Sequence, residues 1–150
     1  MRPVKQKFRH RPEDGVYGDC HRAAMASVLE LDLDDVPHFF DKGVSGEEGE
    51  EAVRLFLGRH GLRAVSFALH GDLDGVLAFM QRINGDDVVW FLGGRSASAC
   101  NHTVVCRGSA IVHDPSLTDA GIVGPCDDGH YWVTVLAAIA PEVLARKVAA

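Results

Sequence analysis

A cysteine stands at a point of the chain where a helix is expected to begin. In the stretch YGDCHRAAMASVLE, Cys20 follows a glycine–aspartate pair and opens an alanine-rich segment. Asp19 is of a type that caps helices, so residues 20–30 are predicted to be helical. The positive end of the helix dipole favours the thiolate over the thiol. Cys20 is therefore a candidate nucleophile, although free cysteines are also often buried for packing alone.

A nucleophilic cysteine needs a base near its sulfur and a third group that orients the base. The chain has 8 histidines. We expect His21 to be a surface residue rather than the base, because adjacent residues of a helix do not face each other. A better-placed histidine lies in the stretch CNHTVVCRGSAIVHDP, which predicts two short strands joined by a turn. His102 begins the first of these strands, and Asp114 lies at the end of the second.

The turn of this hairpin decides whether the histidine and the aspartate meet. A three-residue link over residues 107–109 pairs Cys106 with Ala110. The same register brings His102 opposite Asp114, with Cβ atoms about 4.5–5.5 Å apart, so that the carboxylate can accept the imidazole N–H. A two-residue turn would shift the register by one residue and put the two side chains on opposite faces. The hairpin thus predicts a His–Asp pair on condition that the link has three residues.

Together these segments resemble the papain-like cysteine peptidases, in particular the peptidase C39-like branch and a group of small phage and bacterial proteins. In that family a helical nucleophile segment, here GDCHRAAMASVLELDLDDVPHF, precedes a hairpin, here NHTVVCRGSAIVHDP. The resemblance implies that Cys20 is the nucleophile, His102 the general base and acid, and Asp114 the orienting residue. It also implies an upstream glutamine as oxyanion donor, and Gln6 is the only glutamine before the cysteine. The intervening stretch RHRPEDGVY would then have to loop out.

The remaining segments predict a mixture of helices and strands. Further helices are expected over residues 47–60, 72–83 and 141–150, and strands over residues 62–69, 87–93, 102–106, 110–115 and 131–136. Because helices dominate early and strands later, the fold class is expected to be α+β with a mostly antiparallel sheet. The resemblance implies a papain-like fold, with the N-terminal nucleophile helix packed on that sheet. The length of 150 residues suits a single domain over residues 1–150.

Charge and composition narrow the classes of partner. The formal net charge of −6 argues against nucleic acid as a partner. The basic residues among the first eleven positions are expected to form a solvated arm. We expect no membrane association, because no segment approaches the roughly 18 apolar residues that span a bilayer. Since 4 cysteines are too few for a disulfide scaffold, a cytoplasmic location is predicted, in the host cell if the protein is phage-encoded.

Zinc binding is the main alternative chemistry. Cys100, His102 and Cys106 are separated by one and three residues, and Cys126 precedes His130 by a similar gap. Neither spacing contains the paired cysteines that make a strong zinc signal. We therefore expect no metal and no other cofactor, and we expect the three later cysteines to be structural.

The residues as a set predict a cysteine-dependent hydrolase, a peptidase or isopeptidase that acts on a peptide or protein amide through a Cys20 thioester. Two alternatives stay open. One is an acyltransferase with an amine as acceptor, and the other is a non-enzymatic phage or bacterial binding protein on the same fold. The small-residue loop over 93–101 is expected to line the substrate cleft, whereas Trp132 could belong to the core or shield the His–Asp pair from water.

Overall fold

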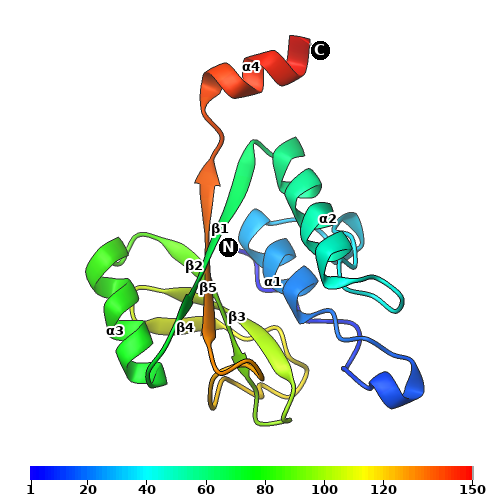
Figure 1. The fold of residues 1–150 in the computed structure, drawn as a ribbon, viewed down its shortest axis with the longest axis vertical. Coiled ribbons are helices and arrows are strands. Elements are labelled where there is room, and N and C mark those ends of the chain that lie inside the picture. The colour runs from blue at the N-terminus through cyan, green and yellow to red at the C-terminus, as the bar shows by residue number, and fades with distance from the viewer. Residues whose placement is uncertain (150) are drawn as a thin grey trace.

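Five strands form one antiparallel sheet, with helices on both of its faces (Figure 1). The computed structural model describes residues 1–149, apart from the side chains of residues 144, 147 and 148. The strand order is β1-β5-β2-β3-β4, and every neighbouring pair is antiparallel. The strands are β1 (Leu62–Leu69), β2 (Val89–Arg95), β3 (Asn101–Arg107), β4 (Ala110–His113) and β5 (Tyr131–Ala138). The expected α+β class with an antiparallel sheet is confirmed.

The helices divide between the two faces of the sheet. In Figure 1, α1 (Cys20–Leu29) and α2 (Gly46–Arg59) lie on one side and α3 (Leu73–Asn84) on the other, whereas α4 (Pro141–Ala149) projects beyond the end of β5. Two short 3-10 helices are η1 (Pro12–Asp14) and η2 (Leu33–Asp35). Residue 150, the last of the predicted C-terminal helix, lies outside the described residues. Within residues 1–149, no helix combines the length and the apolar character needed to cross a membrane.

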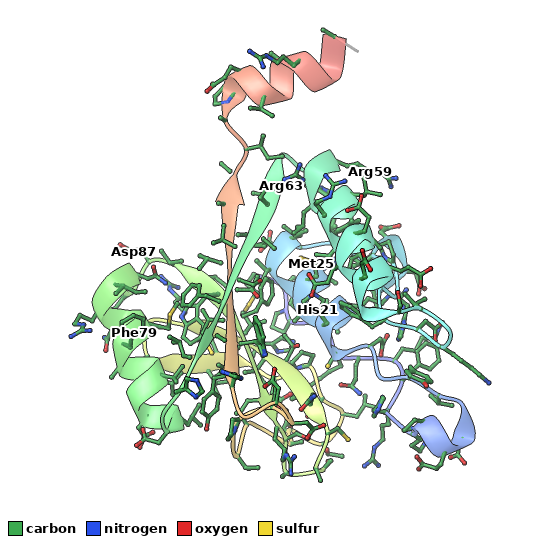
Figure 2. All side chains as sticks on the ribbon, viewed as in Figure 1. His21, Met25, Arg59, Arg63, Phe79 and Asp87 are labelled. Carbon is green, nitrogen blue, oxygen red and sulfur yellow. The ribbon has the colours of Figure 1, made fainter. Side chains whose placement is uncertain are left out.

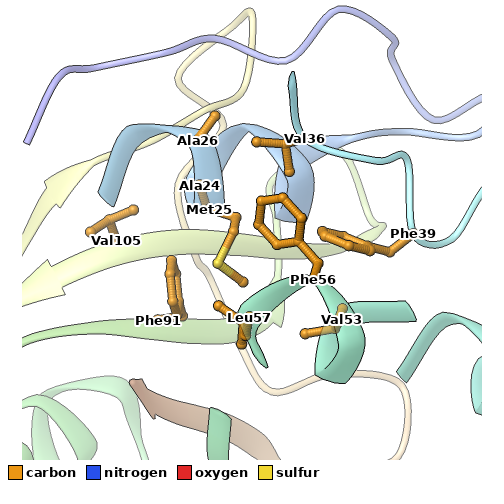
Figure 3. Packing of buried hydrophobic residues seen from close by; sticks show 10 residues of the cluster. All are labelled: Ala24, Met25, Ala26, Val36, Phe39, Val53, Phe56, Leu57, Phe91 and Val105. Atoms are coloured by element: carbon orange, nitrogen blue, oxygen red, sulfur yellow. The ribbon is translucent and has the colours of Figure 1, made fainter. Parts of the chain in front are cut away.

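Each face of the sheet has its own hydrophobic core. On one face, α1 and α2 pack against Phe91 and Val105, as Figure 3 shows. On the other face, Met80 of α3 packs with Trp90 and Leu92. Successive residues of β2 thus alternate between the two cores, as the period of two in a strand requires. This double burial explains why the sequence of β2 is an uninterrupted apolar run.

Small side chains let α1 lie close to the sheet. Ala23, Ala24 and Ala26 are all fully buried. Alanine also has the highest intrinsic helix propensity, so the same residues favour the helix and its close packing. The first residue of this helix is Cys20, so the packing of α1 sets the position of the thiol relative to the start of β3.

The turn between β3 and β4 is shorter than expected. Arg107 pairs with Ala110, so only Gly108 and Ser109 form the link. The prediction of a three-residue link is therefore wrong. Gly108 has a φ of 57°, in the left-handed region that such two-residue turns use and that glycine adopts readily.

A β-bulge compensates for the shorter turn. Val105 pairs with His113, so that Val112 is an extra residue on β4 without a partner on β3. A bulge shifts the alternation of side chains by one residue. Asp114, the first residue after β4, therefore falls on the same side as His102. The two one-residue shifts add up to two, so the aspartate ends on the predicted side, but the register differs: continuing the ladder would place Asp114 opposite Val104 and not opposite His102 as predicted.

Candidate active site

His102 and Asp114 form a hydrogen-bonded pair where β3 begins. Nε2 of His102 lies 2.7 Å from Oδ1 of Asp114, and only 6% and 11% of the two side chains are exposed. Oδ1 also accepts the backbone N–H of Ser116 at 2.8 Å, and Oδ2 accepts that of Gly121 at 2.7 Å. The hydrogen bond expected between the two residues is present, and the loop after β4 holds the carboxylate in place.

In both residues, hydrogen bonds and neighbouring charges outweigh the effect of burial on the pKa. Burial raises the pKa of Asp114, but hydrogen bonds from His102, Ser116 and Gly121 hold this pKa below its usual value. Burial likewise lowers the pKa of His102, but hydrogen bonding and Coulombic attraction to Cys20 and to Asp114 raise it above its usual value. The site therefore favours a charged imidazole beside an ionised carboxylate.

Cys20 opens α1, is half-buried and lines the same two cavities as His102. Since Nε2 of His102 is bonded to Asp114, Nδ1 is the ring nitrogen left for the thiol. The first N–H groups of a helix have no intrahelical acceptor, so the backbone N–H of Cys20 is free to donate to a ligand. Thiol, imidazole and carboxylate thus follow one another in the order that a nucleophile, its base and an orienting group require.

The N-terminal arm brings Gln6 to the same place. Its backbone N–H donates to the carbonyl oxygen of Pro115 at 2.8 Å, and the residue is 8% exposed. Nε2 donates one hydrogen bond to the carbonyl oxygen of Phe8 at 2.7 Å, which leaves its second N–H for another acceptor. Gln6, Cys20 and His102 all line one cavity of about 300 Å³, which we call the arm-side cavity.

The stretch between the glutamine and the cysteine loops out as a small hairpin. Arg11 and Val16 exchange two backbone hydrogen bonds, of 2.8 Å and 3.1 Å, around η1. The returning chain then passes close to the outgoing one. A Cβ on Gly18 would lie 3.0 Å from Cβ and 3.2 Å from the backbone nitrogen of His10. A glycine is needed here because a larger residue would push the arm away from the helix start.

Asp19 ties the arm to α1, a role that the sequence did not indicate. The residue occupies the N-cap position, but its side chain makes no capping hydrogen bond, so the expected cap is wrong in this respect. Instead, Oδ1 accepts the backbone N–H groups of Lys7 and Phe8 at 2.9 Å and 2.8 Å. Oδ2 accepts from Arg22 Nη1 at 3.3 Å. At 2% exposure, this buried carboxylate fixes the arm next to the cysteine.

His21 is only partly exposed and lies among aromatic side chains, whereas it was expected to be a surface residue. Its ring centroid is 6.1 Å, 5.7 Å and 6.1 Å from those of Phe39, Phe40 and Phe91. Figure 2 shows it on α1, one turn from Met25. Its Nε2 atom is buried and has no hydrogen-bond partner among the described residues, and burial lowers its pKa to about 4. His21 is therefore a neutral packing residue near pH 7.

A second cavity, of about 930 Å³, also borders Cys20 and His102. Trp132 stands in its wall, is 43% exposed and donates from Nε1 to Asp128 at 2.7 Å. This tryptophan therefore does not belong to the core. The loop expected near the cleft does lie there, since Ser98 and several neighbours line both cavities.

The other cysteines do not share the surroundings of Cys20. Cys106 is fully buried, and burial raises its pKa to about 12. Burial and then the charges of Asp128 and Asp127 raise the pKa of Cys126. All 4 cysteines are free. Within the part of the chain that the structure describes, no three His, Cys, Asp or Glu side chains are arranged to hold a metal ion.

Comparison with known proteins gives no function for this site. Comparisons of the chain with models of protein families, with curated proteins and with solved structures find no match. Its chemistry follows from its own atoms: a thiol beside an imidazole, a carboxylate behind the imidazole, and amide N–H groups across the cavity. Such a set can activate a sulfur nucleophile and return its proton to a leaving group.

Proposed function

We propose that this protein is a cysteine-dependent hydrolase that cleaves a peptide or isopeptide bond through a thioester on Cys20. The observation that carries the proposal is that Cys20, the first residue of α1, borders the same two cavities as His102, which is itself hydrogen-bonded to Asp114. The other 3 cysteines lack such a base. A packing role for Cys20 would not explain why both oxygens of the Asp114 carboxylate behind His102 are hydrogen-bonded.

The reaction follows from this geometry. Nδ1 of His102 takes the thiol proton while Sγ of Cys20 forms a bond to the carbonyl carbon of the substrate. The backbone N–H of Cys20 and the second side-chain N–H of Gln6 stabilise the oxyanion. The imidazolium then gives its proton to the leaving amine as the carbon–nitrogen bond breaks. Asp114 stabilises the imidazolium during both transfers.

Water completes the cycle by attacking the thioester, with His102 as base and Cys20 as leaving group. An amine acceptor in place of water would make the same chain an acyltransferase. We further propose that the fold is papain-like, because the nucleophile opens a helix packed on an antiparallel sheet and the base begins a strand of that sheet. A single domain in a reducing cytoplasm stays a prediction, with which the 4 free cysteines agree.

Site-specific alkylation tests the proposal without a known substrate. The protein is treated with iodoacetamide near pH 7, and the rate at each of the 4 cysteines is followed by mass spectrometry. We expect Cys20 to react many times faster than half-buried Cys100, and His102→Ala to remove this advantage. Cys100→Ala is the matched control and should leave the Cys20 rate as it is. Equal rates at the two cysteines would contradict a catalytic thiol and favour the binding-protein alternative.

Acyl transfer is then tested with p-nitrophenyl acetate. A burst of nitrophenol with an acetyl group on Cys20 would show the thioester, and Cys20→Ala should abolish both. The half-buried position of Cys20 should tolerate alanine, so the variant is expected to keep its circular dichroism spectrum. Added glycinamide, a weakly reactive amine, separates the two acceptors, because an acyltransferase would yield N-acetylglycinamide in preference to acetate.

A further inference from the structure

The two cavities that meet at Cys20 differ in charge. The chain contains 21 Asp and Glu residues and has a formal net charge of −6, yet none of the residues that line the arm-side cavity is acidic. The larger cavity, by contrast, is lined by Glu13, Glu50 and Asp127 among others. Carboxylates of the protein thus line the larger cavity but not the arm-side cavity.

Arg9 leaves an uncompensated positive charge at the arm-side cavity. This exposed residue lines the cavity and makes no ion pair or hydrogen bond with any described residue. Several other cations of the arm are neutralised: they form the pairs Arg2–Asp32, Lys5–Asp119 and Arg11–Asp14. A free guanidinium presents a planar set of donors that matches a carboxylate.

Ser96 adds an unsatisfied donor in the same wall. The residue is 4% exposed and lines the cavity, and its hydroxyl makes no hydrogen bond among the described residues. Its backbone N–H donates to the carbonyl oxygen of Cys100 at 2.9 Å, so the turn that carries the hydroxyl is fixed. The oxygen of this hydroxyl is accessible from the cavity, so it can donate a hydrogen bond to a ligand oxygen.

We infer that the arm-side cavity binds a carboxylate of the substrate, so that the enzyme prefers peptides that present a carboxylate close to the bond that is cleaved. This inference rests on the proposed function of Cys20. The carboxylate is either the C-terminus of the peptide or an aspartate or glutamate side chain near the bond that is cleaved. Arg9 supplies the charge, and Ser96 supplies a hydrogen bond from a more buried position.

Two alkylating agents of similar size measure the preference directly. Iodoacetate carries a carboxylate where iodoacetamide carries an amide, and the ratio of their rates at Cys20 reports on the charge that the cavity favours. In Arg9→Gln this ratio should fall by about threefold or more, the effect of one partly screened charge contact. Ser96→Ala should lower the ratio as well. Salt at about 0.5 M, roughly three times the physiological ionic strength, should screen the charge of Arg9 and lower the ratio in the wild type.

Arg59→Gln is the matched control, because it removes the same charge from the C-terminal end of α2, away from either cavity (Figure 2). The control should keep the wild-type ratio. An equal fall in Arg9→Gln and Arg59→Gln, or no fall in Arg9→Gln, would overturn the inference while leaving the proposed function intact. Loss of selective alkylation of Cys20 by both reagents in the wild type would overturn the proposed function, and the inference with it.

Protection of Cys20 from iodoacetamide distinguishes the two sources of carboxylate. N-acetylglycine offers a C-terminal carboxylate, and the α-amide of N-acetylglutamic acid offers a side-chain carboxylate. N-acetylglycinamide and N-acetylglutamine amide are their neutral counterparts. Protection by one of the acids, weakened in Arg9→Gln, would support the inference and name the source. Equal protection by an acid and its amide would overturn it.

Discussion

The hydrogen bond between Nε2 of His102 and Oδ1 of Asp114 determines which nitrogen of the imidazole is free. An ionised carboxylate only accepts, so Nε2 carries the hydrogen and a neutral ring is bare at Nδ1. This is the tautomer that can take a proton from Cys20. The backbone N–H groups of Ser116 and Gly121 hold the carboxylate on both oxygens, so the tautomer is set by the loop that follows β4.

Replacing Asp114 by asparagine should weaken the base. The neutral amide of the variant cannot offer the negative charge that helps raise the pKa of His102, so this pKa should fall. The rate of Cys20 alkylation between pH 6 and 7 should drop by about tenfold for each unit by which the pKa falls. Asp119→Asn, which removes an equal charge from the same loop, is the control. If the rate profile of Asp114→Asn against pH matched the wild type, the aspartate would be only a turn residue before Pro115.

The same substitution should change stability in a defined pH window. The pKa of Asp114 is lowered, so its contribution is present above about pH 4 and is lost as the pH falls through the folded-state value. The pKa of His102 is raised, so its contribution is present below about pH 6.5 and is lost as the pH rises through the folded-state value. Urea unfolding at several pH values should therefore show the largest difference between wild type and Asp114→Asn near about pH 5. A difference independent of pH would exclude this linkage.

Gln6→Ala should separate oxyanion stabilisation from thiol activation. Loss of an oxyanion donor lowers catalysis by about 10²- to 10³-fold. Turnover of p-nitrophenyl acetate should fall on this scale, whereas alkylation of Cys20, which forms no oxyanion, should change far less. Gln6→Met has a similar shape without either N–H and adds no charge, so it serves as a matched variant. Equal losses in both assays would mean that Gln6 acts only by holding the arm.

Asp19→Ala should release the arm from the helix start. The substitution leaves the backbone N–H groups of Lys7 and Phe8 without their acceptor, at a cost of about 1–3 kcal/mol in unfolding free energy. Hydrogen exchange should show loss of protection at these two amides. Asp19→Asn retains an oxygen acceptor and should keep most of the protection. Unaltered protection in Asp19→Ala would show that other contacts hold the arm.

His21→Phe should flatten the acid side of the stability curve. In the folded protein the pKa of His21 is lowered to about 4, so unfolding takes up a proton between about pH 6.5 and that value. The wild type should lose stability as the pH falls through this range, and the phenylalanine variant should lose less. Phenylalanine also removes the buried nitrogen that has no partner. If the unfolding free energies of the two proteins fell in parallel as the pH is lowered, the ring of His21 would take up its proton in the folded protein.

The sequence predicted the helices and strands better than their connections. Hydrophobic patterns depend on local spacing, which is why α1, β2 and the hairpin were found. The turn of the hairpin was not, because Arg107 can either pair or belong to the link, and a bulge leaves no clear local signal. The buried positions of Asp19 and His21 depend on the arm and on Phe39 and Phe40, whose approach is tertiary. Ser96 stood out only as part of a small-residue loop.

The bulge at Val112 gives β4 one residue more than its pairing with β3 requires. Val112 is 43% exposed and has no partner on β3, so most substitutions there should be silent. Deletion of this one residue would leave Ile111 paired with Cys106 and bring His113, now next in the chain, opposite Val105, so the ladder would become regular and Asp114 would keep its side. The bulge therefore acts as spare length in β4, because the hairpin can lose one residue here and still bring Asp114 to the side of His102.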